Sequence, residues 1–161
     1  MTLSGGEPLL QADFSLALLN ALSGKIHRAV ETSGYGASEV FERMIHACDF
    51  VFMDLKLYDR AAHRAYTGVS NERILTNARI LKESGIPHRF RIPLIPGLTD
   101  TEENLRELAR VAGDSEVELL SYNRLAPAKY PSVGRVFTDR IRGDQTPEAH
   151  LELFSNAILR R

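Results

Sequence analysis

Two adjacent glycines and a glutamate near the start of the chain combine the features of a small binding turn. They lie in the run Thr2-Leu3-Ser4-Gly5-Gly6-Glu7-Pro8, in which a short β-type stretch precedes Gly5 and Gly6. Glycine lets the backbone turn sharply and approach a ligand without a Cβ clash. Glu7 adds a carboxylate beside that bare backbone, and Pro8 prevents the strand from continuing. Carbonyl oxygens next to an anion suit a small cationic group, such as an amino group.

Polar or glycine-containing clusters also follow each of the other strands that the sequence predicts. Because the carboxyl ends of parallel strands lie at one rim of a sheet, residues far apart in the sequence converge there. We therefore predict a ligand pocket at this rim. The four further clusters are Glu31-Thr32-Ser33-Gly34, Asp54-Leu55-Lys56, Arg91 with Pro96-Gly97, and Tyr122-Asn123.

The charged side chains at the predicted rim are of both signs. Glu7, Glu31 and Asp54 are anionic, whereas Lys56 and Arg91 are cationic. A zwitterion, or a ligand with separated charges, fits such a site better than a plain phosphate compound does. The sequence contains no glycine-rich phosphate loop and no dinucleotide-binding fingerprint.

Neither the histidines nor the single cysteine predicts a metal centre. The five histidines are scattered and form no close pair of the kind that holds a catalytic zinc. His63 is the one whose role stays open, because it lies shortly beyond Lys56. Cys48 is interpreted as a small buried core residue, and one thiol allows neither an internal disulfide nor a cysteine-built cluster. The histidines interpreted as surface or supporting residues are His27, His46, His88 and His150.

The polar clusters are separated by apolar patterns that alternate between strand and helix. Residues 26–30 are expected to form the second of five strands, and the continuous apolar run 50–53 predicts a third strand that is covered on both faces. This alternation predicts an α/β fold of right-handed βαβ units around a parallel sheet, in a single domain over residues 1–161. Thr146-Pro147 is expected to begin a closing helix. The residues assigned to the buried face of that helix are Leu151, Phe154, Ala157 and Ile158.

Composition narrows the class of protein. The chain has 161 residues, of which 43% are hydrophobic and 25% are charged, as is ordinary for a globular domain with a real core. The net charge of −1 provides no field that would attract nucleic acid or an anionic membrane. The sequence has no apolar run of about 18 residues and no secretory signal, so we expect a cytoplasmic protein.

Six segments, in their order along the chain, resemble the glycyl radical enzyme activating enzymes. The likeness is to the pyruvate formate-lyase activating enzyme group of the radical S-adenosylmethionine (SAM) proteins, and it runs from Met1 to about Phe137. Together the segments are far more specific than any one of them. They are 2–9, Glu31-Thr32-Ser33-Gly34, Asp54-Leu55-Lys56, Thr67-Gly68-Val69-Ser70-Asn71, 91–97 and Leu119-Leu120-Ser121-Tyr122-Asn123.

The resemblance implies a partial (β/α)6 barrel of the TIM type, with parallel strands, outer helices and SAM at the rim. By this resemblance Gly5, Gly6 and Glu7 match the segment that receives the amino group of the methionine part of SAM. In some members the acidic residues at Glu31 and Asp54 also help bind a monovalent cation. The residues that match positions holding the carboxylate and the ribose region are Thr32, Asp54, Lys56 and Arg91. Asn123 stands where the family often has histidine, so a plain contact is expected there rather than a proton-linked role.

The chain departs from the family pattern at its start. In the family, three cysteines in a Cys-x3-Cys-x2-Cys loop after the first strand ligate a [4Fe-4S] cluster, and SAM takes the fourth iron. That loop is not in these residues, and Cys48 is expected on a helix, so it cannot replace the loop. We expect the first strand to be missing and the chain to be the C-terminal portion of a radical SAM barrel. Reductive cleavage of SAM to a 5′-deoxyadenosyl radical, which in the intact enzyme abstracts a glycine hydrogen from a partner glycyl radical enzyme, is then not expected of this chain alone.

Two other functions stay open. One is a non-catalytic SAM-binding or interaction module that keeps the rim without the cluster. The other is an unrelated barrel lyase that uses Lys56 as an amine nucleophile, against which Asp54 nearby favours the charged, unreactive ammonium. Without a first strand, an unpaired edge at residues 2–4 is expected to favour a homodimer.

Overall fold

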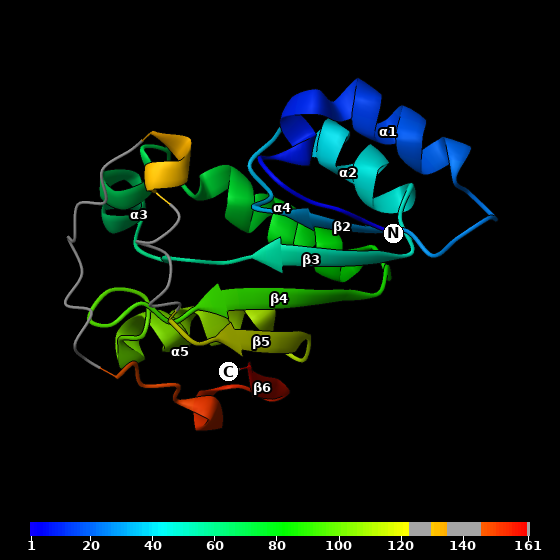
Figure 1. Cartoon of the computed structure of the whole chain (residues 1–161). Coiled ribbons are helices and arrows are strands. Elements are labelled where there is room, and N and C mark those ends of the chain that lie inside the picture. Colours follow the sequence, from blue (N-terminus) through cyan, green and yellow to red (C-terminus); the bar gives the residue numbers. More distant parts are fainter. Residues whose placement is uncertain (123–129, 135–145, 161) are drawn as a thin grey trace.

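The computed structural model describes residues 1–122, 130–134 and 146–160. Six parallel strands form one sheet in the order β1-β2-β3-β4-β5-β6 (Figure 1). Strands that follow one another in both sequence and space are the arrangement of a barrel, so the predicted α/β partial barrel is confirmed. The strands are β1 (Thr2–Leu3), β2 (Ala29–Thr32), β3 (Phe50–Asp54), β4 (His88–Pro93), β5 (Glu116–Leu120) and β6 (Ala157–Arg160).

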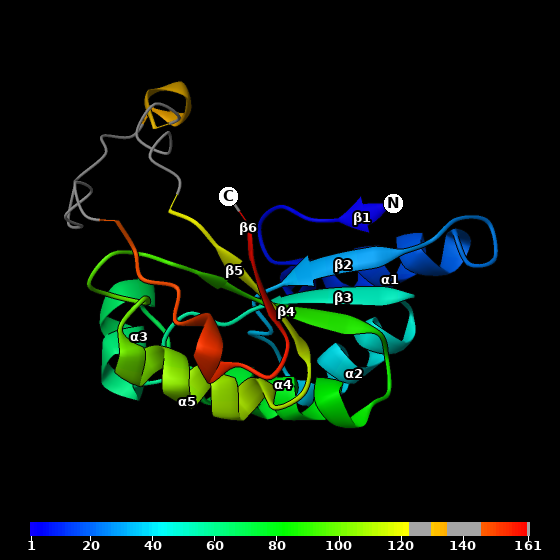
Figure 2. The same cartoon turned by 90° about the horizontal axis from the view of Figure 1, so that it is seen from below.

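The helices α1 to α5 all cover the same face of the sheet, and none of the described helices covers the opposite face between the raised edges β1 and β6 (Figure 2). Among the described residues, no helix is both long and apolar enough to cross a bilayer. The helices are η1 (Pro8–Gln11), α1 (Ala12–Ala21), α2 (Ser38–His46), α3 (Arg60–Thr67), α4 (Glu72–Glu83), α5 (Glu102–Ala112), η2 (Pro131–Val133) and η3 (Leu151–Leu153).

The core lies between the sheet and the helices. Along β3, Val51 and Met53 are fully buried against the helices, whereas the alternate residues are only partly buried. The prediction that residues 50–53 are covered on both faces is therefore wrong. The run is apolar on the open face because the Phe50 and Phe52 rings pack 4.8 Å apart and the Arg91 guanidinium lies 5.3 Å above the Phe52 ring. A cation–π contact thus replaces a covering helix.

The predicted closing helix is wrong. Residues 146–150 have no regular structure, a single 3-10 turn follows, and Ala157–Arg160 forms β6 instead. β6 pairs in parallel with β5, from Val117 opposite Ala157 to Leu120 opposite Arg160. Without this pairing the backbone N–H and C=O groups on one side of β5 would lack partners. Pairing them outweighs the helical spacing of the apolar residues. The sheet has six strands rather than five for the same reason.

The second strand begins later than residues 26–30 predict. β2 starts at Ala29, and Ile26 is 45% exposed. The entry to the strand is fixed by Asp49, whose carboxylate accepts hydrogen bonds from the backbone and the guanidinium of Arg28. These bonds from Arg28 hold the pKa of Asp49 well below its ordinary range. The start of β2 therefore follows this ion pair rather than the first apolar residue of the run.

Candidate ligand-binding site

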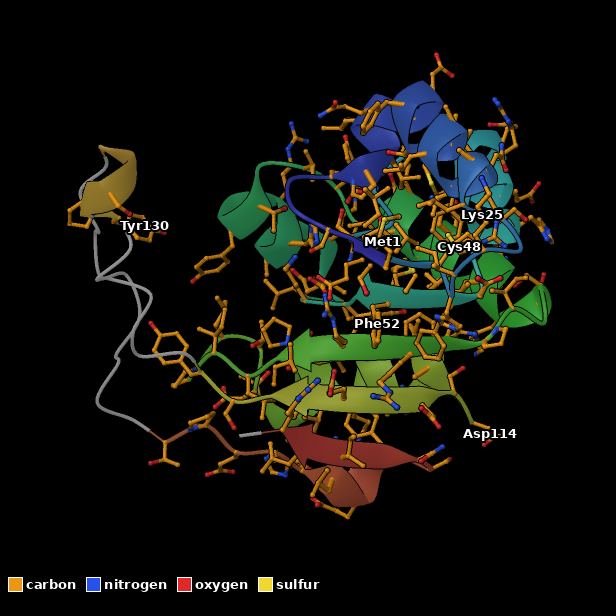
Figure 3. All side chains as sticks on the ribbon, turned by 45° about the vertical axis from the view of Figure 1, so that its right-hand side comes forward. Met1, Lys25, Cys48, Phe52, Asp114 and Tyr130 are labelled. Atoms are coloured by element: carbon orange, nitrogen blue, oxygen red, sulfur yellow. The ribbon has the colours of Figure 1, made fainter. Side chains whose placement is uncertain are left out.

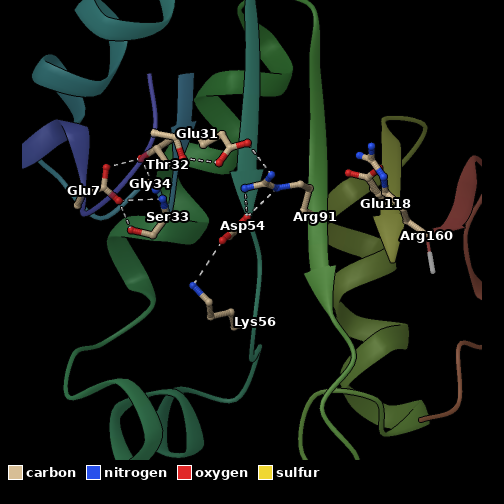
Figure 4. A network of polar contacts seen from close by, with 11 residues as sticks. Glu7, Glu31, Thr32, Ser33, Gly34, Asp54, Lys56, Arg91, Glu118 and Arg160 are labelled. Atoms are coloured by element: carbon tan, nitrogen blue, oxygen red, sulfur yellow. Dashed lines mark hydrogen bonds and ion pairs between the residues drawn. The ribbon is translucent and has the colours of Figure 1, made fainter. Parts of the chain in front are cut away.

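The Glu7 carboxylate connects the turn after β1 to the end of β2. One of its oxygens accepts a hydrogen bond from Thr32 Oγ1 at 2.6 Å. The other accepts from the Ser33 backbone N–H at 2.8 Å and from Ser33 Oγ at 2.5 Å (Figure 4). The side chain also caps η1 by accepting from the Leu9 N–H at 3.2 Å. Glu7 therefore fixes the shape of the rim, and most of its lone pairs are already used.

Three glycines of the rim, Gly5, Gly6 and Gly34, are required for different reasons. Gly5 and Gly6 have φ of 88° and 51°, and no atom lies within 4 Å of the place where a Cβ would stand. They allow the left-handed backbone of the turn and leave it bare. At Gly34, with φ of 71°, a side chain would strain the backbone, and a Cβ would lie 2.2 Å from Met53 Cε, so the end of the Met53 side chain would have to move. The predicted bare turn is present at Gly5 and Gly6.

Arg91 joins the ends of β2, β3 and β4. Its guanidinium donates to Glu31 Oε1 at 2.9 Å and contacts Asp54 Oδ1 at 3.0 Å through two nitrogens (Figure 4). The other oxygen of Glu31 accepts from Ser4 Oγ at 2.6 Å, which links β1 to the same network. The Ser4 hydroxyl and Arg91 hold the pKa of Glu31 below its ordinary value. Although burial lowers the pKa of Arg91, the carboxylates of Asp54 and Glu31 raise it above its ordinary value.

Lys56 is the cation at this rim with unused donors. Its ammonium lies 3.7 Å from Asp54 Oδ2, beyond hydrogen-bond distance, and no other partner is found among the described residues. Lys56, Asp54 and Glu7 line one cavity of about 210 Å³ between η1, the β2–α2 loop and α3. Residues separated by up to 49 positions thus meet as the strand ends predicted. Side chains of both signs face this space.

A larger hollow of about 680 Å³ lies elsewhere, among the first turns of α3, α4 and α5. Its lining includes Tyr58, Leu75 and Leu98 and shares no residue with the predicted rim site. Volume alone does not identify a binding site, so we take the smaller cavity, which holds the charged residues, as the candidate.

Three buried asparagines shape the rim. The sequence placed Asn71 in one of the six family segments without predicting its role, and it indicated no role for Asn77 or Asn104. Asn77 donates to the carbonyls of Gly34 and Gly36 at 2.8 and 3.2 Å. Asn71 donates to the carbonyls of Leu57 and Tyr58, while Asn104 donates to those of Lys56 and Thr99 and accepts from the Tyr58 N–H. The position of Asn77 in the sequence indicates its burial, because it lies on the same face of the helix as the apolar residues Ile74 and Leu81. A polar residue on a buried stripe needs partners, and these asparagines find them in loop carbonyls.

Glu118 lies farther along the open face, on β5, and was also missed. Its side chain is only 2% exposed and accepts from Arg160 of β6 at 2.9 Å, with Arg89 Nη1 3.8 Å away (Figure 4). These pairs attach β6 to the sheet across its open face. Asn123, a predicted contact residue, lies outside the described residues.

The sequence profile of the radical SAM superfamily matches residues 1–109. The chain belongs to the radical SAM superfamily. The isethionate sulfite-lyase activating enzyme of Oleidesulfovibrio alaskensis is 44% identical over 140 residues, which are 84% of this chain and 45% of that protein. The 4-hydroxyphenylacetate decarboxylase activating enzyme of Clostridioides difficile strain 630 is 36% identical over 165 residues, covering 99% of this chain and 52% of that protein. This radical SAM chain therefore spans about half the length of the curated relatives it matches.

A solved structure agrees with this radical SAM assignment. A domain of pyruvate-formate lyase-activating enzyme from Bacteroides vulgatus superposes with a TM-score of 0.79 at 27% identity, covering 100% of this chain and 98% of that one. The resemblance to activating enzymes of glycyl radical enzymes, expected from the six segments, is confirmed by these relatives.

Radical SAM proteins use SAM and a [4Fe-4S] cluster, and the two groups fit this chain differently. SAM carries an amino-acid group with separated charges, which suits the mixed charges of the 210 Å³ cavity. The cluster needs several thiolates. The chain has one cysteine, and Cys48 is 5% exposed within the packing near α2 (Figure 3). Burial raises the pKa of Cys48 to about 12, so it stays a neutral thiol. The residues of this chain do not fit the cluster.

Proposed function

We propose that this chain is the SAM-binding portion of an activating enzyme that generates the glycyl radical of a partner enzyme. The observation that carries the proposal is the convergence of Glu7, Asp54, Lys56 and Arg91 at one rim. The names of the relatives support the class of partner, a glycyl radical enzyme. SAM, when bound, supplies the sulfonium whose cleavage gives radical SAM enzymes their radical.

Each residue of the rim is proposed to hold a different part of SAM. Lys56 holds the carboxylate of the methionine part, since its ammonium has unused donors. Gly5 and Gly6 offer bare backbone to the amino group, and Glu7 fixes that turn through Thr32 and Ser33. Arg91 is already paired with Glu31 and Asp54, so it holds these two carboxylates in place near the ribose region or a monovalent cation. Asn123 completes the proposed contacts.

Titration calorimetry of the chain with SAM tests this proposal. We expect weak binding, because these residues supply no cluster iron to anchor SAM. Lys56→Met should weaken it by about tenfold, the effect of losing one charged hydrogen bond. Lys25→Met is the control, because the Lys25 ammonium donates to the Ala21 carbonyl at the end of α1 and does not line the cavity. Equal affinities for the Lys56 and Lys25 variants would refute the assignment of the rim.

A non-catalytic SAM-binding or interaction module is the second candidate for this chain by itself. The buried, neutral Cys48 favours it, because no thiolate is offered to iron. We infer that the chain alone binds SAM without cleaving it. Reconstitution with iron and sulfide under anaerobic conditions, followed by an assay for SAM cleavage, separates the two candidates. Cleavage would assign the activase chemistry to these residues, whereas iron-free protein and intact SAM support the module.

We also propose that the chain associates with a second copy along β1. Thr2–Leu3 pairs only with β2, so one side of its backbone lacks a strand partner among the described residues. Light scattering should show a mass that rises toward the dimer as the protein concentration increases. A constant monomer mass up to millimolar concentration contradicts this proposal and leaves the SAM site untouched.

A further inference from the structure

His63 on α3 is a buried titratable residue at the rim with no role in the site described above. Its side chain is 3% exposed, and it lines the 210 Å³ cavity together with Glu7, Asp54 and Lys56. The sequence left His63 open, because proximity to Lys56 does not show which way the ring faces. The structure fixes the ring by two contacts, and these determine which nitrogen is available.

The contacts at Nδ1 define the tautomer of His63. Nδ1 lies 2.8 Å from the carbonyl oxygen of Val69. A carbonyl can only accept, so Nδ1 carries a proton and donates it. Thr67 Oγ1 stands 3.0 Å from the same nitrogen and donates to the His63 carbonyl at 2.7 Å. In the neutral ring Nε2 then holds a lone pair, and it is an acceptor.

Nε2 has no partner among the described residues. Every fully buried side-chain nitrogen and oxygen in that part of the chain has one. Nε2 is therefore not sealed in the core, and the hollow that His63 lines is the cavity beside Lys56. A volume of about 210 Å³ equals that of about seven waters in the liquid, which is room for an amino-acid group.

The other polar side chains of the cavity determine which donors and acceptors a bound ligand needs. The Glu7 oxygens are already bonded to Thr32, Ser33 and Leu9, so they offer little to a further donor. Lys56 still offers donors, and His63 Nε2 offers an acceptor. A ligand that pairs with both must carry an acceptor anion and a donor, as the carboxylate and ammonium of an α-amino acid do.

We propose that His63 is a ligand-binding residue whose Nε2 accepts a hydrogen bond from the ammonium of an α-amino-acid group that Lys56 holds by its carboxylate. This inference rests on the proposed function, because in SAM that group is the methionine part. An ammonium has three N–H donors and the Glu7 carboxylate is already occupied, so His63 Nε2 adds an acceptor to those of the bare Gly5-Gly6 turn and of Asp54, which lines the same cavity.

Nitrogen-15 NMR of the chain labelled at histidine tests the assignment without an activity assay. At a pH where the rings are neutral, the His63 Nε2 signal should be that of an unprotonated nitrogen and should move upfield on addition of SAM. L-methionine, which has the amino-acid group alone, should also move it, whereas adenosine should not. His88 is the internal control, because its Nδ1 also faces a carbonyl, that of Ile86, but its Nε2 is already paired with Ser115 Oγ at 3.0 Å.

Two variants separate binding from structure. His63→Asn keeps a donor where Nδ1 stands and removes the acceptor at the Nε2 position, so it should fold normally and bind SAM about tenfold more weakly. His63→Gln places a carbonyl oxygen near the Nε2 position and loses the bond to Val69, so it should bind more tightly than His63→Asn while melting at a lower temperature. A purely structural His63 gives the reverse order of binding, which overturns the proposal.

The outcomes also distinguish this inference from the proposed function. If SAM binds with the Lys56 dependence predicted above and the His63 signal does not move, the role of His63 is wrong and the SAM site stands. If L-methionine and SAM both fail to bind, the proposed function fails first. A His63 shift caused by adenosine as strongly as by L-methionine also overturns the inference, because it assigns the cavity to the nucleoside.

Discussion

Arg91→Met is expected to lower the free energy of unfolding by about 2 to 3 kcal/mol and to abolish SAM binding. The substitution leaves Glu31 and Asp54 facing each other without their shared cation, and it removes the guanidinium from the Phe52 ring. Removing one partner from a fully buried ion pair costs about 3 to 5 kcal/mol. The side chains of Glu31 and Asp54 are 31% and 28% exposed, so we expect a smaller loss than that.

Urea unfolding of Arg91→Met, with Arg106→Met as the matched control, measures this effect. Arg106 pairs with Glu102 one turn away on the exposed side of α5, so its loss should cost less than about 0.5 kcal/mol. Arg91→Lys should recover part of the stability, because an ammonium keeps the charge but cannot reach both carboxylates in the same way. Equal losses in the Arg91 and Arg106 variants would show that the network at the rim contributes nothing to stability.

The pH dependence of the same variant provides an independent check. The pKa of Glu31 is lowered in the fold by the Ser4 hydroxyl and then by Arg91. A carboxyl whose folded pKa is lowered contributes stability above its unfolded pKa of about 4.3, and that stability is lost as the pH falls through the folded value. Below about pH 4 the wild-type chain should therefore lose stability more steeply than Arg91→Met does. The Ser4 bond remains in the variant, so the slope should shrink rather than vanish.

The location of the site could be predicted from the sequence because it depends on topology. Strand ends are recognisable locally, since an apolar run stops at Asp54 or a glycine turn follows at Gly5 and Gly6. Once the strands are parallel, these ends must share one rim. The prediction needed no knowledge of distances, only of the direction in which each strand runs.

The partners of each side chain could not be predicted, because they depend on geometry across the sheet. Glu7 was expected to face a ligand, but its oxygens accept from Thr32 and Ser33. Of the two rim cations, Lys56 rather than Arg91 keeps unused donors among the residues that the structure describes. Likewise, Asn77 looks like an ordinary polar residue until the carbonyls of the β2–α2 loop are placed above it.

β6 shows that the spacing of apolar residues alone does not determine whether a segment forms a helix or a strand. The spacing of apolar residues in 151–158 suits a helix, and only the open edge of β5 decides otherwise. Glu118 also favours the strand, because its buried carboxylate needs a cation and Arg160 of β6 supplies one. Long-range pairing of this kind leaves no local mark in the sequence.

Asn104→Leu should produce the other large effect, a loss of about 3 kcal/mol in the free energy of unfolding together with weaker SAM binding. Leucine has a similar volume but no polar atoms, so the carbonyls of Lys56 and Thr99 and the N–H of Tyr58 all lose their partner. Each buried group left unsatisfied costs about 1 to 3 kcal/mol, and the exposed edge of this loop reduces the total. One of the carbonyls that Asn104 holds is that of Lys56 itself, so the backbone that positions the Lys56 ammonium loses a contact.

Hydrogen exchange at the Tyr58 amide is the local measurement that distinguishes this cause from general destabilisation. In the wild type the amide donates to Asn104 Oδ1 at 2.8 Å, so it should exchange slowly. In Asn104→Leu it should exchange faster than the Leu55 amide, which keeps its bond to the Arg91 carbonyl at 2.9 Å. Asn156→Leu is the control, because the Asn156 side chain is exposed and should leave both amides unchanged. If Tyr58 stays protected in Asn104→Leu, the loop that carries Lys56 is held by other contacts, and the affinity for SAM should then match that of the wild type.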